Sequence, residues 1–240
     1  MSKGFFIDTT VCTACRGCQV ACKQWHDLPA EITKNRGTYE NPPDLSFDTY
    51  KVVRFREDEV DGKLVWLFFP EQCRHCVEPP CVDTAEDETA IFKDPRTGAV
   101  IFTANTKNLD ADAIIESCPY NIPRKSADGS LLAKCDMCND RVENGLLPAC
   151  VQSCPTGAMN FGEREDMVAL AKKRLAQIKA KYPKAQLLDA DDVDVIYLTA
   201  YDPSLYSEYA IASKGSFDMT RHMALKKMFR PLKNITSILG

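Results

Sequence analysis

The chain has 240 residues, of which 45% are hydrophobic and 27% charged, and this balance excludes a disordered or fibrous protein. Its 30 basic and 34 acidic residues give a net charge of −4, which argues against a nucleic-acid-binding surface. The longest apolar run, residues 64–69, is far too short to span a bilayer. Residues 1–8 reach an acidic side chain before the apolar segment of a signal peptide could form.

Short strands and helices are predicted along the whole chain. Strands are expected at residues 5–11, 50–56, 63–69, 90–93, 99–103 and 193–199. Two of the gaps between strands contain turn residues, Asp61-Gly62 and Asp94-Pro95, and these predict hairpins. Helices are expected at residues 108–116, 163–182 and 203–210, and Pro183 ends the longest of them.

Cysteine is the unusual component, because all twelve cysteines lie between Cys12 and Cys154. Disulfides fit badly, since residues 12–22 hold four thiols whose pairing would strain the backbone. The chain is also large enough to fold without such cross-links. The clustering therefore indicates metal ligation.

Two sets of cysteines have the spacing of iron–sulfur loops. Cys12-x2-Cys15-x2-Cys18-x3-Cys22 has the spacing of a two-cluster bacterial ferredoxin, with Lys23 in place of the usual proline. Three thiolates two residues apart let a short loop wrap one corner of a cubane. The second set is Cys135-x2-Cys138-x11-Cys150-x3-Cys154-Pro155, which taken alone is also compatible with a zinc site.

The third set is split and incomplete. It consists of Cys73-x2-Cys76-x4-Cys81 and of Cys118-Pro119. The ferredoxin template places its missing cysteines at Ala85, Asn108, Ala111 and Ile114. Because the fourth cysteine of each loop binds the other cluster of a pair, these four positions are the full ligand set of one cluster. The sequence thus predicts a four-cluster plan that has lost one cluster, with Leu109 and Ala113, or Ile114 and Ile115, filling the vacated volume.

The same crossing rule sorts the twelve cysteines into three groups, each expected to bind one 4Fe–4S cluster. The first group is Cys12, Cys15, Cys18 and Cys154; the second group is Cys22, Cys135, Cys138 and Cys150; the third group is Cys73, Cys76, Cys81 and Cys118. Because each 4Fe–4S cluster needs four cysteines, twelve cysteines give three clusters whether or not the fourth cysteine of a loop binds the other cluster of its pair. The crossing decides which cysteine serves which cluster.

The cysteine loops closely resemble the iron–sulfur subunit of molybdopterin formate dehydrogenases. The resemblance is carried by GFFIDTT at 4–10, CTACRGCQVACKQW at 12–25, QCRHCVEPPC at 72–81 and KCDMC at 134–138, and extends over roughly residues 4–210. Relatives of this superfamily usually hold four 4Fe–4S clusters. A three-cluster version is similar to the small subunit of the soluble, periplasmic enzyme that uses tungsten or molybdenum.

The resemblance implies a heterodimer in which a large catalytic subunit holds the pterin-bound metal and oxidises formate to CO2. It implies export to the periplasm together with that subunit, with a cytoplasmic location as the alternative. Membrane-bound relatives carry a C-terminal transmembrane helix, whereas basic residues such as Lys214, Arg221 and Lys226 exclude one here. A soluble acceptor such as a multihaem cytochrome c is therefore expected.

The expected fold is α+β, with two interleaved ferredoxin-like cores, one of which has lost a cluster, and a C-terminal helical extension. Residues 1–49 with 124–162 form the core with two clusters, residues 50–123 form an inserted core with one cluster, and residues 163–240 form the extension. No nucleotide-binding, zinc-protease or serine-hydrolase motif is present, so no catalytic residue is predicted. The alternatives are a subunit of another molybdopterin oxidoreductase or a hydrogenase, and a zinc-organised interaction module.

Several residues beside the loops are candidates for tuning the clusters. Arg16, Arg74 and Lys134 are cations that would raise a cluster's potential, or else solvated surface charges. His75 is a candidate for tuning or for ligation. Trp25 and His26 either line an electron path or pack in the ordinary way, and His222 is expected to be exposed.

Overall fold

The structure is a computed structural model that describes residues 2–212. Its strands are β1 (Lys3–Asp8), β2 (Val52–Val60), β3 (Lys63–Glu71), β4 (Ile91–Lys93), β5 (Val100–Phe102), β6 (Arg124–Lys125), β7 (Leu132–Ala133), β8 (Met159–Glu163), β9 (Gln186–Leu188) and β10 (Val195–Thr199). Its α-helices are α1 (Gly17–Trp25), α2 (Pro80–Ala85), α3 (Ala111–Glu116), α4 (Asn139–Glu143), α5 (Ala149–Gln152) and α6 (Arg164–Ile178). Three 3-10 helices cover Thr9–Val11, Ala104–Asn108 and Pro203–Leu205.

A four-stranded mixed sheet organises one side of the molecule, with the strand order β8-β1-β10-β9. The strand β1 pairs parallel to β10, with Phe5 opposite Val195, and antiparallel to β8. Every residue of β10 and nearly every residue of β1 is buried, as expected of central strands covered on both faces. The chain after residue 163 thus returns to complete the sheet around β1.

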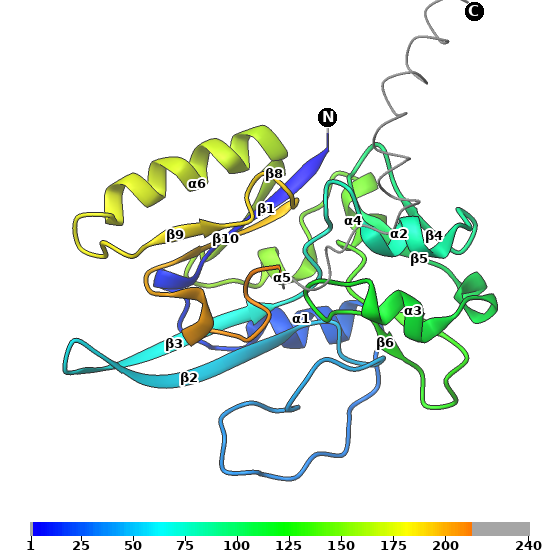
Figure 1. Ribbon diagram of the computed structural model, residues 1–240, viewed down its shortest axis with the longest axis horizontal. Coiled ribbons are helices and arrows are strands. Elements are labelled where there is room, and N and C mark those ends of the chain that lie inside the picture. The colour runs from blue at the N-terminus through cyan, green and yellow to red at the C-terminus, as the bar shows by residue number, and fades with distance from the viewer. Residues whose placement is uncertain (1, 213–240) are drawn as a thin grey trace, which may run out of the picture.

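The two faces of this sheet pack against different elements, because side chains alternate along a strand. One face packs on the β2–β3 hairpin through Phe5, Ile7, Val195, Tyr197, Val53, Leu67 and Phe69. The other face packs on α6 through Phe6, Ile196, Leu198, Ala171 and Ile178. Figure 1 shows α6 on one side of the sheet and the long hairpin on the other.

Gly4 lies where β1 approaches its neighbours most closely. A Cβ atom on Gly4 would lie 2.9 Å from the backbone oxygen of Asp194 and 3.3 Å from the Cα atom of Arg164. The backbone oxygen of Asp194 also accepts a hydrogen bond from the Phe5 N–H, so it is not free to move away. We expect Gly4→Ala to lower the free energy of unfolding by about 1–3 kcal/mol. An unchanged midpoint of thermal unfolding would contradict this expectation.

Most of the predicted elements are confirmed. The strands β2 and β3 pair across Asp61 and Gly62, whose positive φ angles of 53° and 73° suit a two-residue hairpin turn. The strands β4 and β5 form the second hairpin, and β10 and α6 lie where they were expected. The first strand ends at Asp8, because the Asp8 side chain accepts a hydrogen bond from the Thr10 N–H and starts a 3-10 helix.

Two predicted helices differ from the structure. The helix expected over residues 108–116 begins only at Ala111, since the Asp110 side chain caps it by accepting hydrogen bonds from the Asp112 and Ala113 N–H groups. The prediction of a helix over residues 203–210 is wrong, because the helical part is a single 3-10 turn over Pro203–Leu205. Beyond it the buried Tyr206 accepts a hydrogen bond from the Ala200 N–H, so tertiary contacts determine the path there.

The basic C-terminal segment and His222 lie outside the described residues. Within residues 2–212, no helix combines the length and the hydrophobicity that crossing a bilayer requires. The described part is a mixed α and β structure in which short helices and loops carry all twelve cysteines.

Candidate metal centre

The first group of cysteines surrounds one cavity. Its lining includes Cys12, Cys15, Cys18 and Cys154 together with Ala14, Val53, Pro70 and Met159. About 320 Å³ of this cavity is not filled by atoms. Cys15 is exposed whereas Cys18 is buried, so this group reaches the protein surface.

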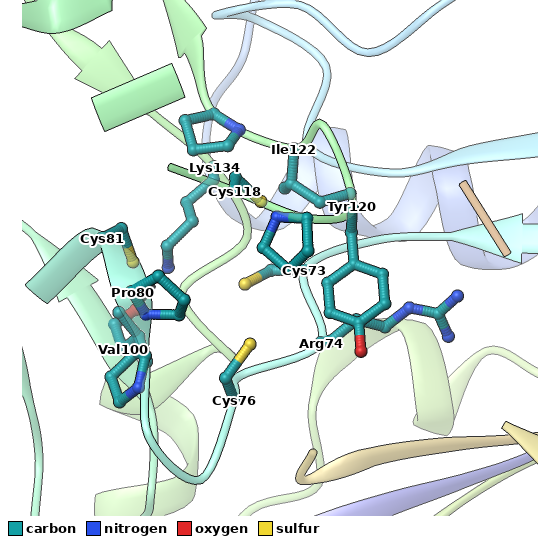
Figure 2. Close-up of a pocket in the computed structure, with 13 residues that line it drawn as sticks. Cys73, Arg74, Cys76, Pro80, Cys81, Val100, Cys118, Tyr120, Ile122 and Lys134 are labelled. Atoms are coloured by element: carbon teal, nitrogen blue, oxygen red, sulfur yellow. Dashed lines mark hydrogen bonds between the residues drawn. The ribbon is translucent and has the colours of Figure 1, made fainter. Parts of the chain in front are cut away.

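The third group surrounds a second cavity, of about 340 Å³. Its lining includes Cys73, Cys76, Cys81 and Cys118 together with Pro79, Pro80, Val100 and Ile122. Figure 2 shows the four sulfur atoms directed toward a common space, although Cys118 comes from a segment well separated from the other three. Burial raises the pKa of the Cys81 thiol to about 12 and that of Cys118 to about 11.

The second group lies entirely in the interior, since all four of its cysteines are buried. Burial raises the pKa of Cys22 well above its usual value, and the Cys150 and Cys138 thiols raise it further. Burial likewise raises the pKa of Cys135, with added contributions from Cys22 and Cys138. These mutual effects indicate that the four thiols of the second group lie near one another.

The second group also adjoins both of the others. The Cys18 thiol of the first group raises the pKa of Cys150, in addition to the larger effect of burial. The Cys73 thiol of the third group does the same to Cys135. These effects indicate that the buried second group lies next to the first group, of which Cys15 is exposed, and next to the third group.

Several residues of the cysteine loops adopt the left-handed backbone conformation, which lets the loops turn tightly. Ala14, Arg16, His75, Met137 and Cys138 all have positive φ angles, between 48° and 67°. Such non-glycine conformations cost about 1–3 kcal/mol each and persist where the surroundings impose them. They turn the His75 N–H toward the Cys73 sulfur at 3.4 Å and the Met137 N–H toward the Cys135 sulfur at 3.5 Å.

The donor set of the three groups suits iron–sulfur clusters. Each group offers four soft sulfur ligands, the coordination of a 4Fe–4S cluster and also of a structural zinc ion. The free space inside the two cavities, about 320 and 340 Å³, is partly open to solvent, and the four sulfurs of the first and of the third group line it. Binding to iron would keep these buried thiols deprotonated.

Two of the three predicted cations are not solvated surface charges. Arg74 and Lys134 are only 3% and 6% exposed. The Arg74 guanidinium lies 3.9 Å from the centre of the Tyr197 ring and points away from the four sulfurs, whereas the Lys134 ammonium extends toward them (Figure 2). Arg16 is half-buried and lies over the Phe55 ring beside the first cavity.

His75 is not among the lining residues of the third cavity. Its Nδ1 accepts a hydrogen bond of 2.9 Å from the Val100 N–H, so the proton of the neutral ring is on Nε2. Burial lowers the pKa of His75 well below its usual value, which keeps the ring neutral. Its contacts are those of a residue that fixes the loop, and they give no support to ligation.

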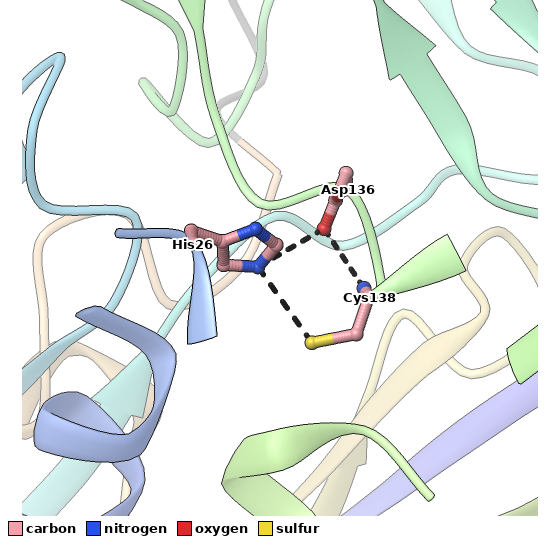
Figure 3. Close-up of side chains that lie close together, drawn as sticks. All are labelled: His26, Asp136 and Cys138. Atoms are coloured by element: carbon pink, nitrogen blue, oxygen red, sulfur yellow. Dashed lines mark hydrogen bonds and ion pairs between the residues drawn. The ribbon is translucent and has the colours of Figure 1, made fainter. Parts of the chain in front are cut away.

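Residues after the first loop reach the second group. The His26 Nε2 atom lies 3.7 Å from the Cys138 sulfur and 3.3 Å from a carboxylate oxygen of Asp136. Figure 3 shows the three side chains directed toward one another. Trp25 is 42% exposed and donates a hydrogen bond to the Asp140 carboxylate. From the sequence, His26 either lines an electron path or packs in the ordinary way, and no spacing signal linked it to Cys138.

Lys51 is a charged residue near the sulfurs that sequence analysis missed. It lies directly before β2 and is 2% exposed. Burial disfavours its ammonium form, but the Cys18 and Cys150 thiolates more than compensate and raise the pKa of Lys51. Only the three-dimensional fold brings it beside cysteines of two different loops.

Comparisons with known proteins agree with this chemistry. Residues 64–164 match the family described as 4Fe-4S dicluster domain. The chain is 62% identical to formate dehydrogenase subunit beta of Megalodesulfovibrio gigas, over 88% of this chain and 100% of that protein. It is 56% identical to formate dehydrogenase 2 subunit beta (cytochrome c-553) of Nitratidesulfovibrio vulgaris, over 88% and 99%.

The similarity extends to a more distant relative. The chain is 38% identical to the iron–sulfur subunit of the nitrate-inducible formate dehydrogenase of Escherichia coli, over 83% of this chain and 69% of that protein. Identity of this extent, over a structure that gathers twelve cysteines into three groups, identifies the role as well as the ancestry. The chain belongs to the family of formate dehydrogenase beta subunits, the iron–sulfur subunits that transfer electrons in these oxidoreductases.

Proposed function

We propose that this chain carries electrons from a catalytic tungsten- or molybdenum-pterin subunit of a formate dehydrogenase through three 4Fe–4S clusters to a soluble acceptor. The observation that carries the proposal is the arrangement of the twelve cysteines as three groups, with the buried second group adjoining the other two. Such a series provides a continuous route through a subunit that has no catalytic motif of its own.

Each group binds one cluster, and the ligand sets follow the crossed arrangement. The first and third groups each line a single cavity, and this supports assigning Cys154 to the first cluster and Cys118 to the third. The mutual effects of Cys22 with Cys138 and Cys150 support the second set. When bound, the clusters supply one-electron carriers, and the protein residues hold them in position and set their charge environment.

The chain is built from two interleaved ferredoxin-like cores, residues 1–49 with 124–162 and residues 50–123, and the second of these has lost a cluster. Packing supports this proposal. Ala85, Ala111 and Ile114, three of the four positions where the template expects cysteine, belong to one hydrophobic cluster with Ile91 and Leu132. Apolar side chains thus fill the region where a fourth cluster would need ligands.

The partners and the location are inferred from the relatives. A beta subunit requires a catalytic subunit, and the name of the Nitratidesulfovibrio relative includes cytochrome c-553. We therefore propose a heterodimer that works in the periplasm and reduces a cytochrome c. Loaded clusters of about −2 each would bring the chain from −4 to about −10, a charge that favours a lysine-rich acceptor.

Native mass spectrometry tests the cluster count. The complex with the catalytic subunit is purified without air. The iron–sulfur subunit is then released from it in the instrument, and its mass is measured. We expect its mass to exceed that of the polypeptide by three Fe4S4 units, together with formate-driven reduction of a cytochrome c by the intact complex. A mass that fits zinc ions without sulfide would refute the proposal and favour the interaction module, whereas reduction of quinone but not of cytochrome would refute only the acceptor.

A further inference from the structure

Within residues 2–212, the ammonium group of Lys51 is enclosed in the protein without a carboxylate partner. Its Nζ donates hydrogen bonds to the backbone oxygen of Pro70, at 3.3 Å, and to the side-chain oxygen of Gln72. Both acceptors are neutral. Among residues 2–212, the groups that raise the pKa of Lys51 are thiols and the Tyr197 hydroxyl, and none of the largest contributors is a carboxylate.

A buried ammonium is very unfavourable unless opposite charge lies close to it. Two neutral hydrogen-bond acceptors do not provide that charge. The sulfurs of two cysteine groups would provide it as thiolates bound to iron. Pro70, whose oxygen accepts the Lys51 hydrogen bond, lines the cavity of the first group. The Lys51 ammonium also counteracts the effect of burial on the pKa values of Cys12 and Cys18 of the first group and of Cys22 and Cys150 of the second. Lys51 therefore acts on both groups at once.

The other cations near the loops lack this combination. Arg16 is half-buried, so water screens its charge. The Arg74 guanidinium lies among the rings of Phe69, Tyr120 and Tyr197 and donates a hydrogen bond to the Ala210 oxygen. Lys134 lines the cavity of the third group and donates hydrogen bonds to the Val100 and Cys135 oxygens.

We propose that Lys51 is a positioning residue for electron transfer between the first and second clusters: its fixed positive charge favours the reduced, more negative state of both. One electron leaves one cluster and arrives on the other, so no proton moves and no bond is made or broken. The charge raises both potentials relative to that of the third cluster, so both clusters accept an electron more readily while the difference between the two stays nearly the same. This inference rests on the proposed function.

Lys51→Met tests the inference, because methionine keeps an unbranched apolar side chain and removes the charge. The variant is made in the complex with the catalytic subunit, and the potential of each cluster is measured by redox titration followed by electron paramagnetic resonance. We expect the equilibrium constant for reduction to fall about tenfold at two of the three clusters. A tenfold fall makes the midpoint potential of a cluster about 59 mV more negative. The third potential is expected to stay at its wild-type value.

Two further variants serve as controls. Lys51→Arg keeps the charge and is expected to keep the potentials close to those of the wild type. Lys172→Met removes a charge from an exposed position of α6 and is expected to shift none of them. Unchanged potentials in Lys51→Met with a full iron content would overturn the inference.

If Lys51→Met fails to retain its iron, Gln72→Glu tests the role of the Lys51 charge instead. This change leaves Lys51 in place and puts a carboxylate where the side-chain oxygen of Gln72 already accepts its hydrogen bond. The ion pair neutralises the ammonium, so the same two potentials should become more negative, and their constancy would refute the role of Lys51. Absence of iron from the wild-type protein would instead refute the proposed function.

Discussion

Cys150→Ala is expected to stop electron transfer to the cytochrome while formate oxidation by the catalytic subunit continues. Cys150 lies in α5, is 5% exposed, and belongs to the buried second group that adjoins both of the others. Loss of residues that merely support a metal ligand reduces affinity or activity by roughly 10–100-fold, so loss of a ligand should lower cytochrome reduction by about 100-fold or more. The subunit should also unfold at a lower temperature, because cluster binding contributes to folding.

Two assays on one preparation separate the steps. Formate-driven reduction of a small dye reports on the catalytic subunit, and reduction of the cytochrome reports on the complete route. Iron content and thermal unfolding are measured in parallel. Gln152→Ala is the matched control, since Gln152 is an exposed residue of the same short helix. A Cys150→Ala variant with full iron content and wild-type cytochrome reduction would contradict the ligand assignment.

Ile114→Ala is expected to destabilise the protein by about 2–5 kcal/mol, the usual range when a buried isoleucine is truncated. Ile114 is 1% exposed and packs with Ala90, Ile91, Val100 and Leu132. The variant would leave a cavity in the region where we propose that apolar side chains replaced a cluster. The third group lies beside this region through Cys81, so its cluster should also be lost more readily on warming.

Thermal unfolding of the iron-loaded protein, followed without air, measures this effect. Ile114→Val should shift the midpoint far less, because it removes one methyl group at about 0.5–1.5 kcal/mol. Ile32→Ala is a control at a fully exposed isoleucine and should leave the midpoint unchanged. Equal midpoints for Ile114→Ala and the wild type would show that the packing around Ile114 contributes nothing to stability.

Local signals in the sequence were sufficient for much of the fold. The turn residues Asp61 and Gly62 predicted the long hairpin, and the helical spacing after residue 163 predicted α6, although the helix ends at Ile178 and not at residue 182 as Pro183 suggested. The spacing of the cysteines predicted three groups of four, and the members of the first and of the third group each line one cavity. These features depend on neighbours in the chain, for which residue type and spacing are informative.

Contacts between distant segments were not predictable in this way. Lys51 lies within the strand predicted over residues 50–56, and nothing in the spacing of its neighbours placed it near Cys18 and Cys150. The contact between His26 and Cys138 likewise joins two loops that the sequence keeps far apart. Residues 203–210 failed as a helix because a buried tyrosine, and not local propensity, directs the chain there.

The pairing of β1 with β10 has a consequence for how the protein is made. The last ligand of the third group, Cys118, leaves the ribosome well before Cys154 of the first group, and the parallel neighbour of β1 follows only with Thr199. Contacts between such distant segments form late. The amino-terminal cysteine loop is thus the first to be synthesised, and the fourth cysteine of the first group and the parallel partner of β1 follow only after most of the described residues.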